Sequence, residues 1–140
     1  MNPIIIVDSN KEDADFLIQS FIDVGTKAGF RCFSSSAEAL EYLKTTHDRP
    51  LAIISDINLP YTSGLSFKQA INDTENLRYI NIPFFFFSKT RNDDLVDGAL
   101  CLSVQGYYRK PDNITDFDIV AKNIKKYLDN HHLNNFEIIN

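Results

Sequence analysis

The stretch Pro83-Phe84-Phe85-Phe86-Phe87-Ser88 is the strongest indication of the fold class. Consecutive phenylalanines leave no polar face, so a strand formed by them must be covered on both sides. The run is of strand length, begins after a proline and consists of aromatic residues, which favours a strand over a helix. A strand buried on both faces is typical of a parallel sheet that carries helices on each side.

Strand-length apolar runs recur on both sides of this stretch. They are Pro3 to Val7, Phe30 to Phe33, Leu51 to Ser55 and Gly106 to Lys110. Between these runs the apolar residues follow a helical period. One apolar stripe consists of Ala14, Leu17, Ile18, Phe21 and Ile22, and a second consists of Phe117, Val120, Ile124, Tyr127 and Leu128. Weaker helical patterns cover 64–72 and 93–101. Five strand–helix repeats predict a doubly wound α/β domain in which a five-stranded parallel sheet has helices on both faces.

Hydroxyl residues followed three positions later by a carboxylate predict several helix starts. The pairs are Ser9 with Glu12, Ser35 with Glu38 and Thr115 with Asp118. Each hydroxyl is expected to accept a hydrogen bond from a free backbone amide in the first turn of the helix.

Length and composition predict one soluble domain in a reducing, cytoplasmic environment. A chain of 140 residues has room for one core, which we place in residues 1–129, with a tail, 130–140, that is expected to fray. Nineteen acidic residues against fourteen basic ones disfavour nucleic acid as a partner. The sequence has neither a secretory signal nor a run long enough for membrane insertion. Cys32 and Cys101 lack a metal or redox spacing and are expected in the core.

Polar side chains stand at the carboxyl ends of four predicted strands. Asp8 follows the first, Asp56 the third, Ser88 ends the fourth and Lys110-Pro111 ends the fifth. In open parallel sheets, ligands bind beyond this edge. Two neighbouring carboxylates favour a hard cation such as Mg²⁺, and an aspartate beside that ion is a nucleophile for phosphorus.

These residues and their order resemble the receiver domain of two-component response regulators. The resemblance spans about residues 3–129 and is strongest in Ser55-Asp56-Ile57-Asn58-Leu59-Pro60, followed by Gly64. It implies the flavodoxin-like strand order 2-1-3-4-5 and a phosphorelay signalling role in which chemistry is at most self-catalysed phosphoryl transfer and autodephosphorylation. The chain is similar to the small stand-alone chemotaxis-type regulators, so we expect it to signal through protein contacts.

The resemblance also implies a role for each residue at this edge of the sheet. Asp56 accepts a phosphoryl group from a sensor histidine kinase or a histidine phosphotransfer protein, and an unidentified downstream protein reads the result. Asp8, Asp56 and the backbone carbonyl of Asn58 hold Mg²⁺, while Ser88 and Lys110 bind the phosphoryl oxygens.

Two further residues match moving or orienting parts of such domains. Tyr107 matches the aromatic residue that acts as a switch together with Ser88. Pro111 matches a proline whose preceding peptide bond is usually cis, which would aim Lys110 at the site.

Two residues depart from the family pattern. Ser9 stands where a second carboxylate normally touches the metal, so we expect it to contact the ion directly or through a water. Lys89 replaces a small residue after Ser88 and is expected to narrow the approach to Asp56 or to add positive charge there. Ser9 is also a candidate N-cap of the first helix.

Other functions remain open at this point. A degenerate receiver would bind partners without being phosphorylated, and Ser9 and Lys89 motivate that alternative. A phosphatase with an aspartyl nucleophile usually needs a second aspartate two residues on, where this chain has Asn58. Nucleotide and flavin binding are disfavoured because the first predicted turn has no GxGxxG or Walker A pattern.

Overall fold

A computed structural model of the chain describes residues 2–133, and for residues 78–80 and 131–133 it describes the backbone alone. The strands are β1 (Ile4–Val7), β2 (Phe30–Phe33), β3 (Ala52–Ser55), β4 (Phe84–Ser88) and β5 (Gly106–Arg109). The helices are α1 (Lys11–Asp23), α2 (Ser36–Thr45), α3 (Gly64–Asp73), α4 (Glu75–Ile80), α5 (Asp93–Leu100) and α6 (Phe117–Leu133), and a 3₁₀ turn (Ile114–Asp116) precedes α6.

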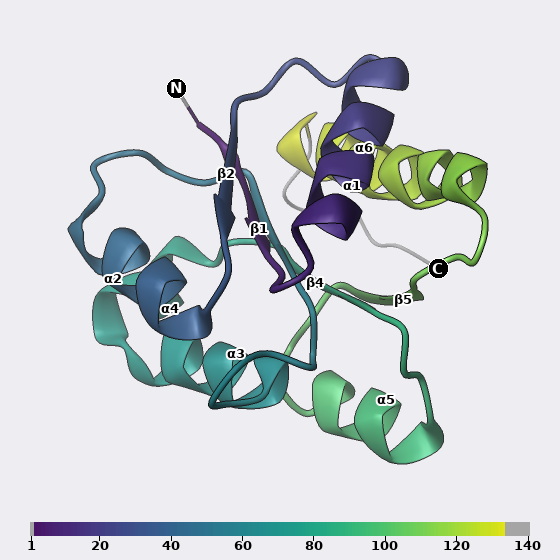
Figure 1. Cartoon of the computed structure of the whole chain (residues 1–140). Coiled ribbons are helices and arrows are strands. Elements are labelled where there is room, and N and C mark those ends of the chain that lie inside the picture. Colours follow the sequence, from purple (N-terminus) through teal and green to yellow (C-terminus); the bar gives the residue numbers. More distant parts are fainter. Residues whose placement is uncertain (1, 134–140) are drawn as a thin grey trace.

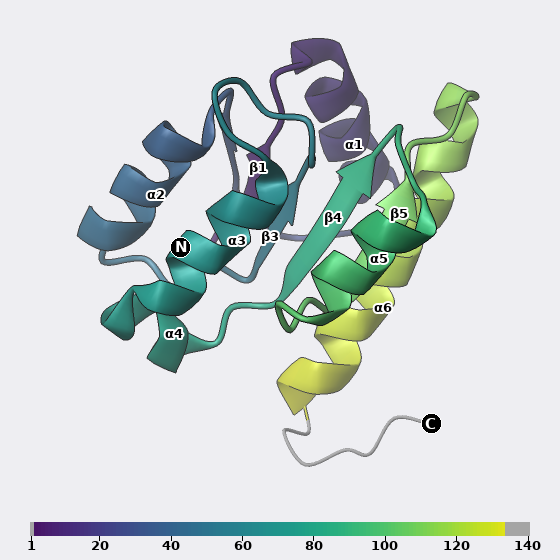
Figure 2. The same cartoon turned by 90° about the horizontal axis from the view of Figure 1, so that it is seen from below.

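The five strands form one parallel sheet in the order β2-β1-β3-β4-β5, as predicted. Helices α1 and α6 cover one face, and α2 to α5 cover the other (Figures 1 and 2). The direction of winding reverses between β1 and β3, which lie side by side in the middle of the sheet. The loops that leave their carboxyl ends therefore diverge to opposite faces, and such a divergence is where open α/β sheets bind ligands.

The phenylalanines of β4 are divided between two cores, which explains why the run has no polar member. Phe85 and Phe87 pack with the α1 and α6 side chains, whereas Phe84 and Phe86 pack with those of α2 to α5. All four are at most 2% exposed. Burying a large apolar side chain contributes about 1.5–3 kcal/mol, so this strand anchors both layers.

Helix α4 was not predicted from the sequence. It has six residues, begins at Glu75, and its N-cap residue Thr74 makes no side-chain capping hydrogen bond. Leu77 is its one residue in the core among those whose side chains are described. A single buried position shows no helical period, which is why pattern reasoning missed it.

One of the three predicted capping pairs is confirmed. The Ser35 hydroxyl accepts from the Glu38 amide at the start of α2. Helix α1 is capped by Asn10 rather than Ser9, because the Asn10 side chain reaches the Asp13 amide. At the other end of the chain, Asn113 caps the 3₁₀ turn, and the prediction for Thr115 was wrong.

The structure bears on two predictions about the outer parts of the domain. Helix α6 continues to Leu133, past the boundary placed at residue 129. Residues 134–140 lie outside the described part of the chain, so the frayed tail stays a prediction. Cys32 and Cys101 are exposed rather than in the core, the first on the edge strand β2 and the second at the end of α5. None of the helices described is both long and apolar enough to cross a bilayer.

Candidate functional site

The side chains at the carboxyl edge are held in place by the sheet itself. The Asp8 amide donates to Phe33 O at 3.0 Å, and the Asp56 amide donates to Val7 O at 2.9 Å. On the far side, the Lys110 amide donates to Ser88 O at 2.8 Å. Each residue follows its strand but keeps one ladder hydrogen bond, so its side chain starts from a fixed backbone position.

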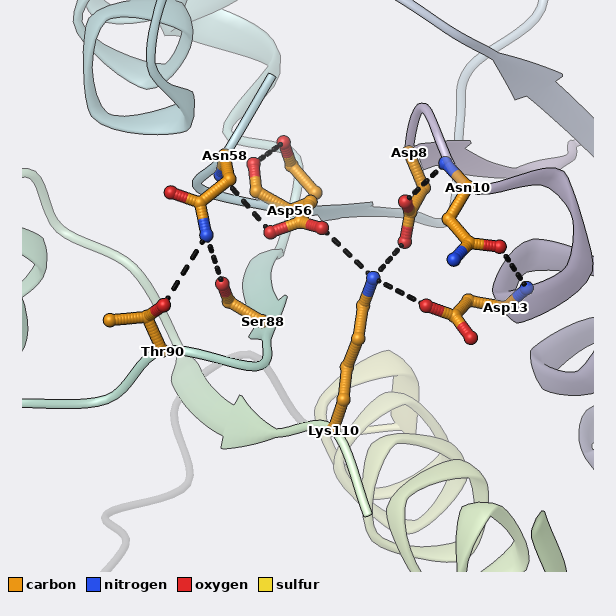
Figure 3. Close-up of polar contacts among 9 residues, drawn as sticks. Asp8, Asn10, Asp13, Asp56, Asn58, Ser88, Thr90 and Lys110 are labelled. Carbon is orange, nitrogen blue, oxygen red and sulfur yellow. Dashed lines mark hydrogen bonds and ion pairs between the residues drawn. The ribbon is translucent and has the colours of Figure 1, made fainter. Parts of the chain in front are cut away.

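The Lys110 ammonium is the centre of the site (Figure 3). Its Nζ lies 2.7 Å from Asp8 Oδ2, 2.9 Å from Asp13 Oδ2 and 2.9 Å from Asp56 Oδ2. A lysine has three N–H donors, and each of them has a carboxylate within hydrogen-bond distance. The structure thus brings Asp8, Asp56 and Lys110 together as the sequence predicted.

Both strand-end aspartates also organise the loop that follows them. Asp8 Oδ1 accepts from the Asn10 amide at 2.9 Å, and Asp56 Oδ1 accepts from the Asn58 amide at 3.1 Å. A short acidic side chain that accepts from the amide two residues on is a common turn-forming arrangement. In both residues one oxygen therefore fixes the loop while the other faces Lys110.

Sequence reasoning missed Asp13. It lies in the first turn of α1, and its side chain is 16% exposed. The signal was an acidic residue at the start of the helix that follows β1, because such a residue lies at the same edge of the sheet as Asp8. An acidic residue such as Asp13 in the first turn is also favoured by the helix dipole, so its position alone does not indicate a functional role.

The charges of the site are unbalanced. Three carboxylates surround one ammonium, and Lys110 is 5% exposed. Burial by itself lowers the pKa of Lys110, but hydrogen bonds to Asp8, Asp56 and Asp13 outweigh it and raise the pKa above its usual value. Burial raises the pKa of Asp8 in spite of its hydrogen bond from Lys110. The net negative charge favours a further cation at this site.

The donor atoms at this edge suit a hard divalent cation. They are carboxylate oxygens of Asp8 and Asp56, with the backbone carbonyl of Asn58 and the hydroxyl of Ser9 in the same two loops. Within the described residues, no three Asp, Glu, His or Cys side chains are grouped as a ready metal centre. An ion bound here would keep several waters, which is the usual habit of Mg²⁺.

A polar network extends from the site to β5. The buried Ser88 hydroxyl accepts from Asn58 Nδ2 at 3.5 Å, and Thr90 Oγ1 accepts from the same nitrogen at 3.4 Å. The Tyr107 hydroxyl donates to Thr90 O, and its ring centroid lies 6.0 Å from that of Phe86. Burial, followed by the negative charge of Asp56, raises the pKa of Tyr107. Thr90 was not predicted as part of the site.

Gly64 allows the loop after β3 to fold back closely onto the backbone of Asp56 and Ile57. Its amide donates to Ile57 O at 2.7 Å. A Cβ atom at this position would lie 2.3 Å from Asp56 O and 2.9 Å from Ile57 Cα, both of them backbone atoms. Only glycine fits, which explains the Gly64 of the motif quoted above.

Solved structures with this arrangement of strands and helices are numerous. No protein-family model matches the chain, and no curated protein sequence matches it significantly. The phosphorylated cyanobacterial phytochrome response regulator RcpA aligns with a TM-score of 0.81 and 23% identity, covering 91% of this chain and 93% of its own. The Mn²⁺-bound response regulator Rcp1 aligns with a TM-score of 0.79 and 21% identity, covering 91% and 94%.

The chain has the fold of a response regulator receiver domain. A single-domain chemotaxis regulator, CheY4 of Vibrio cholerae, aligns less closely, with a TM-score of 0.71 and 19% identity over 89% of this chain and 98% of its own. At these identities the likeness establishes the fold, while roles of individual residues depend on the geometry described above.

The peptide bond before Pro111 differs from the one expected from the receiver pattern. Residues 2–133 contain no cis peptide bond, so Pro111 follows a trans bond and the prediction for it was wrong. Lys110 reaches the site nevertheless, because its amide is bonded to Ser88 O and its ammonium is held by Asp8 and Asp56. These contacts orient the side chain without a cis bond.

The two departures from the receiver pattern both lie at the surface. Ser9 is exposed beside Asp8, and Lys89 is exposed directly after Ser88. The first removes a negative charge from the edge of the site, and the second adds a positive charge to its rim.

Proposed function

We propose that this protein is a phosphorylation-dependent signalling switch of the two-component type, acting in the cytoplasm. Asp56 accepts a phosphoryl group from a histidine kinase or a histidine phosphotransfer protein, and a downstream protein reads the change. The observation that carries the proposal is the contact of Lys110 Nζ with Asp56 Oδ2 at 2.9 Å and Asp8 Oδ2 at 2.7 Å, at the carboxyl edge of the sheet. An aspartate beside a buried ammonium is suited to hold a transferred phosphoryl group.

The transfer step is a displacement at phosphorus. A carboxylate oxygen of Asp56 forms a bond to phosphorus as the phosphorus–nitrogen bond of phosphohistidine breaks, and the released imidazole nitrogen takes up a proton from solvent. Lys110 stabilises negative charge on the transferred oxygens, and the Ser88 hydroxyl donates to one of them. Attack of water on the acyl phosphate then regenerates Asp56 and releases inorganic phosphate.

A divalent cation, Mg²⁺ in the cell, belongs to this site. Asp8, Asp56 and the Asn58 carbonyl would hold it, with Ser9 in contact directly or through a water. The ion supplies Lewis acid stabilisation of the phosphoryl oxygens. The Mn²⁺-bound form of Rcp1 supports a divalent cation in a protein of the same fold.

The switch connects Asp56 to the surface around β5. When a phosphoryl oxygen draws the Ser88 hydroxyl toward Asp56, the contact of Ser88 with Asn58 is lost and the loop containing Thr90 is free to move. Tyr107, which donates to Thr90 O, follows that loop. Partner affinity then changes on the surface of α5, β5 and α6. Lys89, on the same loop, modifies access to Asp56 or charge at the phosphoryl group.

Incubation with acetyl phosphate and Mg²⁺, followed by intact mass measurement, tests the proposal. The wild type is expected to gain the mass of one phosphoryl group, and Asp56→Asn is expected to gain none. Asp15→Asn is the matched control, because it removes the same charge from an exposed residue of α1. Equal labelling of the wild type and Asp56→Asn would overturn the assignment of the acceptor.

The second candidate is a degenerate receiver that binds partners without phosphorylation. It is favoured by the exposed hydroxyl of Ser9 where a metal carboxylate is expected. On this alternative the wild type gains no mass with acetyl phosphate at any Mg²⁺ concentration, and Mg²⁺ does not shift its melting temperature.

A further inference from the structure

Asp13 lies within hydrogen-bond distance of Lys110, whose ammonium has three N–H donors. The proposed function gives Asp13 no role. Its Oδ2 lies 2.9 Å from Lys110 Nζ, the same distance as Asp56 Oδ2. Asn10 fixes the turn that carries it, because the Asn10 side chain accepts from the Asp13 amide at 3.1 Å. The position of this carboxylate is therefore set by the backbone of α1 as well as by the lysine.

Asp13 shares the Lys110 ammonium with the two aspartates that would hold a metal. Asp8 and Asp56 lie at the ends of β1 and β3, whereas Asp13 approaches Lys110 from helix α1 (Figure 3). Without Asp13, the ammonium would be shared between Asp8 and Asp56 alone. It would then compete more strongly with a cation for their oxygens.

Asp13 also restores the charge that Ser9 lacks. With Asp13, three carboxylates surround one ammonium, a net charge of two negative units that matches a divalent cation. Without it, the net charge would be one negative unit. Both effects act in the same direction, since less negative charge and stronger competition from Lys110 each weaken binding of a cation.

We propose that Asp13 is a positioning residue for Lys110 that compensates for the missing carboxylate at Ser9 and keeps the site able to bind a divalent cation. The inference rests on the proposed function and concerns the regulation of the same site. Asp13 acts through Lys110 and through its charge, and it is not a ligand of the ion.

The test is a titration of the full-length protein with Mn²⁺, in which free Mn²⁺ is measured by electron paramagnetic resonance. Asp13→Asn is expected to raise the Kd by about three- to tenfold, because one unit charge is removed close to the ion. Asp15→Asn is the matched control, since Asp15 lies on the same helix and pairs with Lys11 at the surface. Its Kd is expected to stay within about twofold of the wild type.

Two further readouts separate positioning from a merely structural role. The melting temperature of Asp13→Asn without divalent ions is expected to stay within about 2 °C of the wild type, because Lys110 keeps Asp8 and Asp56 as carboxylate partners. In the double variant Ser9→Asp with Asp13→Asn, the Kd is expected to return to within about twofold of the wild-type value.

The outcomes are distinguishable. A Kd for Asp13→Asn equal to that of Asp15→Asn, in a wild type that binds Mn²⁺ and is phosphorylated, would overturn this inference and leave the proposed function intact. A large loss of metal-free stability in Asp13→Asn without rescue by Ser9→Asp would show a structural role instead. A wild type that binds no Mn²⁺ and takes up no phosphoryl group would overturn both proposals.

Discussion

Two lysines, Lys110 and Lys68, are buried to nearly the same degree and have opposite surroundings. They are 5% and 7% exposed. Lys110 donates to three carboxylates, which raise its pKa against the effect of burial. Lys68, on α3, donates to Asn72 Oδ1 at 2.8 Å and lies 5.4 Å from the centroid of the Phe84 ring, and burial lowers its pKa.

The difference shows that burial does not by itself identify a functional charge. Among the side chains described, Lys68 has no carboxylate partner, and its neighbours are an amide and an aromatic face. These contacts are those of a side chain retained in a packed interface. Lys110 lies where several strand ends converge and carries an excess of opposite charge, which is the arrangement of a site that binds ions or transfers groups.

The largest expected effect is that of Lys110→Met. It leaves Asp8, Asp13 and Asp56 without their shared cation, and breaking a buried ionic network of this kind costs about 3–5 kcal/mol. Urea unfolding without divalent ions is expected to show a loss of this size, and Mg²⁺ is expected to restore part of it. Lys122→Met, at an exposed position of α6, is the control and is expected to change stability by less than about 0.5 kcal/mol. A loss no larger than the control would contradict the central role of Lys110.

Lys68→Met is expected to have a smaller effect of the opposite sign. Methionine fills a similar volume without a charge to desolvate, so the variant is expected to gain about 1 kcal/mol at pH 7 after the loss of the bond to Asn72. The same urea experiment measures it. If Lys68→Met were destabilised as strongly as Lys110→Met, the contrast between the two lysines would be wrong.

The smallest effect is a difference in alkaline pH dependence. The raised pKa of Lys110 contributes stability below the unfolded value of about 10.5, and this contribution is lost as pH rises through the higher folded pKa. The raised pKa values of Tyr107, Tyr108 and Tyr127 act in the same direction above pH 10.

The contribution of Lys68 to the pH dependence of stability has the opposite sign. Its pKa is lowered in the folded state, so stability increases as pH rises toward the unfolded value of 10.5. Urea midpoints measured from pH 8 to 12 are expected to fall at the alkaline end in the wild type. The fall is expected to be shallower in Lys110→Met and to begin earlier in Lys68→Met. Identical profiles for the three proteins would show that neither lysine has a shifted pKa.

Most of the fold could be predicted from the sequence because buried parallel strands and amphipathic helices have distinct periods. The run from Phe84 to Phe87 indicated the double-sided sheet, and the stripe that includes Leu17 and Phe21 indicated α1. Helix α4 escaped because Leu77 is its single described core residue. Local capping was less predictable, since Asn10 and Ser9 are both good caps and backbone geometry selects between them.

The sequence predicted those residues of the candidate site that lie at the ends of strands. Asp8, Asp56, Ser88 and Lys110 all lie at ends of strands, and the sheet brings three of them into contact. Asp13 and Thr90 were missed because they belong to a helix turn and a loop, whose side-chain directions depend on tertiary packing. For the same reason the trans bond before Pro111 could not be predicted from its sequence position.

The account depends most on whether Asp56, Ser88, Lys110 and a divalent cation can together enclose a phosphoryl-sized group. Beryllofluoride bonds to an aspartate oxygen and imitates that group, so ¹⁹F NMR of the protein with beryllofluoride and Mg²⁺ measures the geometry without a donor. Discrete bound fluorine resonances are predicted for the wild type, and they are predicted to disappear in Asp56→Asn and on removal of Mg²⁺. Only free beryllofluoride in the wild-type spectrum, or an unchanged bound signal in Asp56→Asn, would contradict the account.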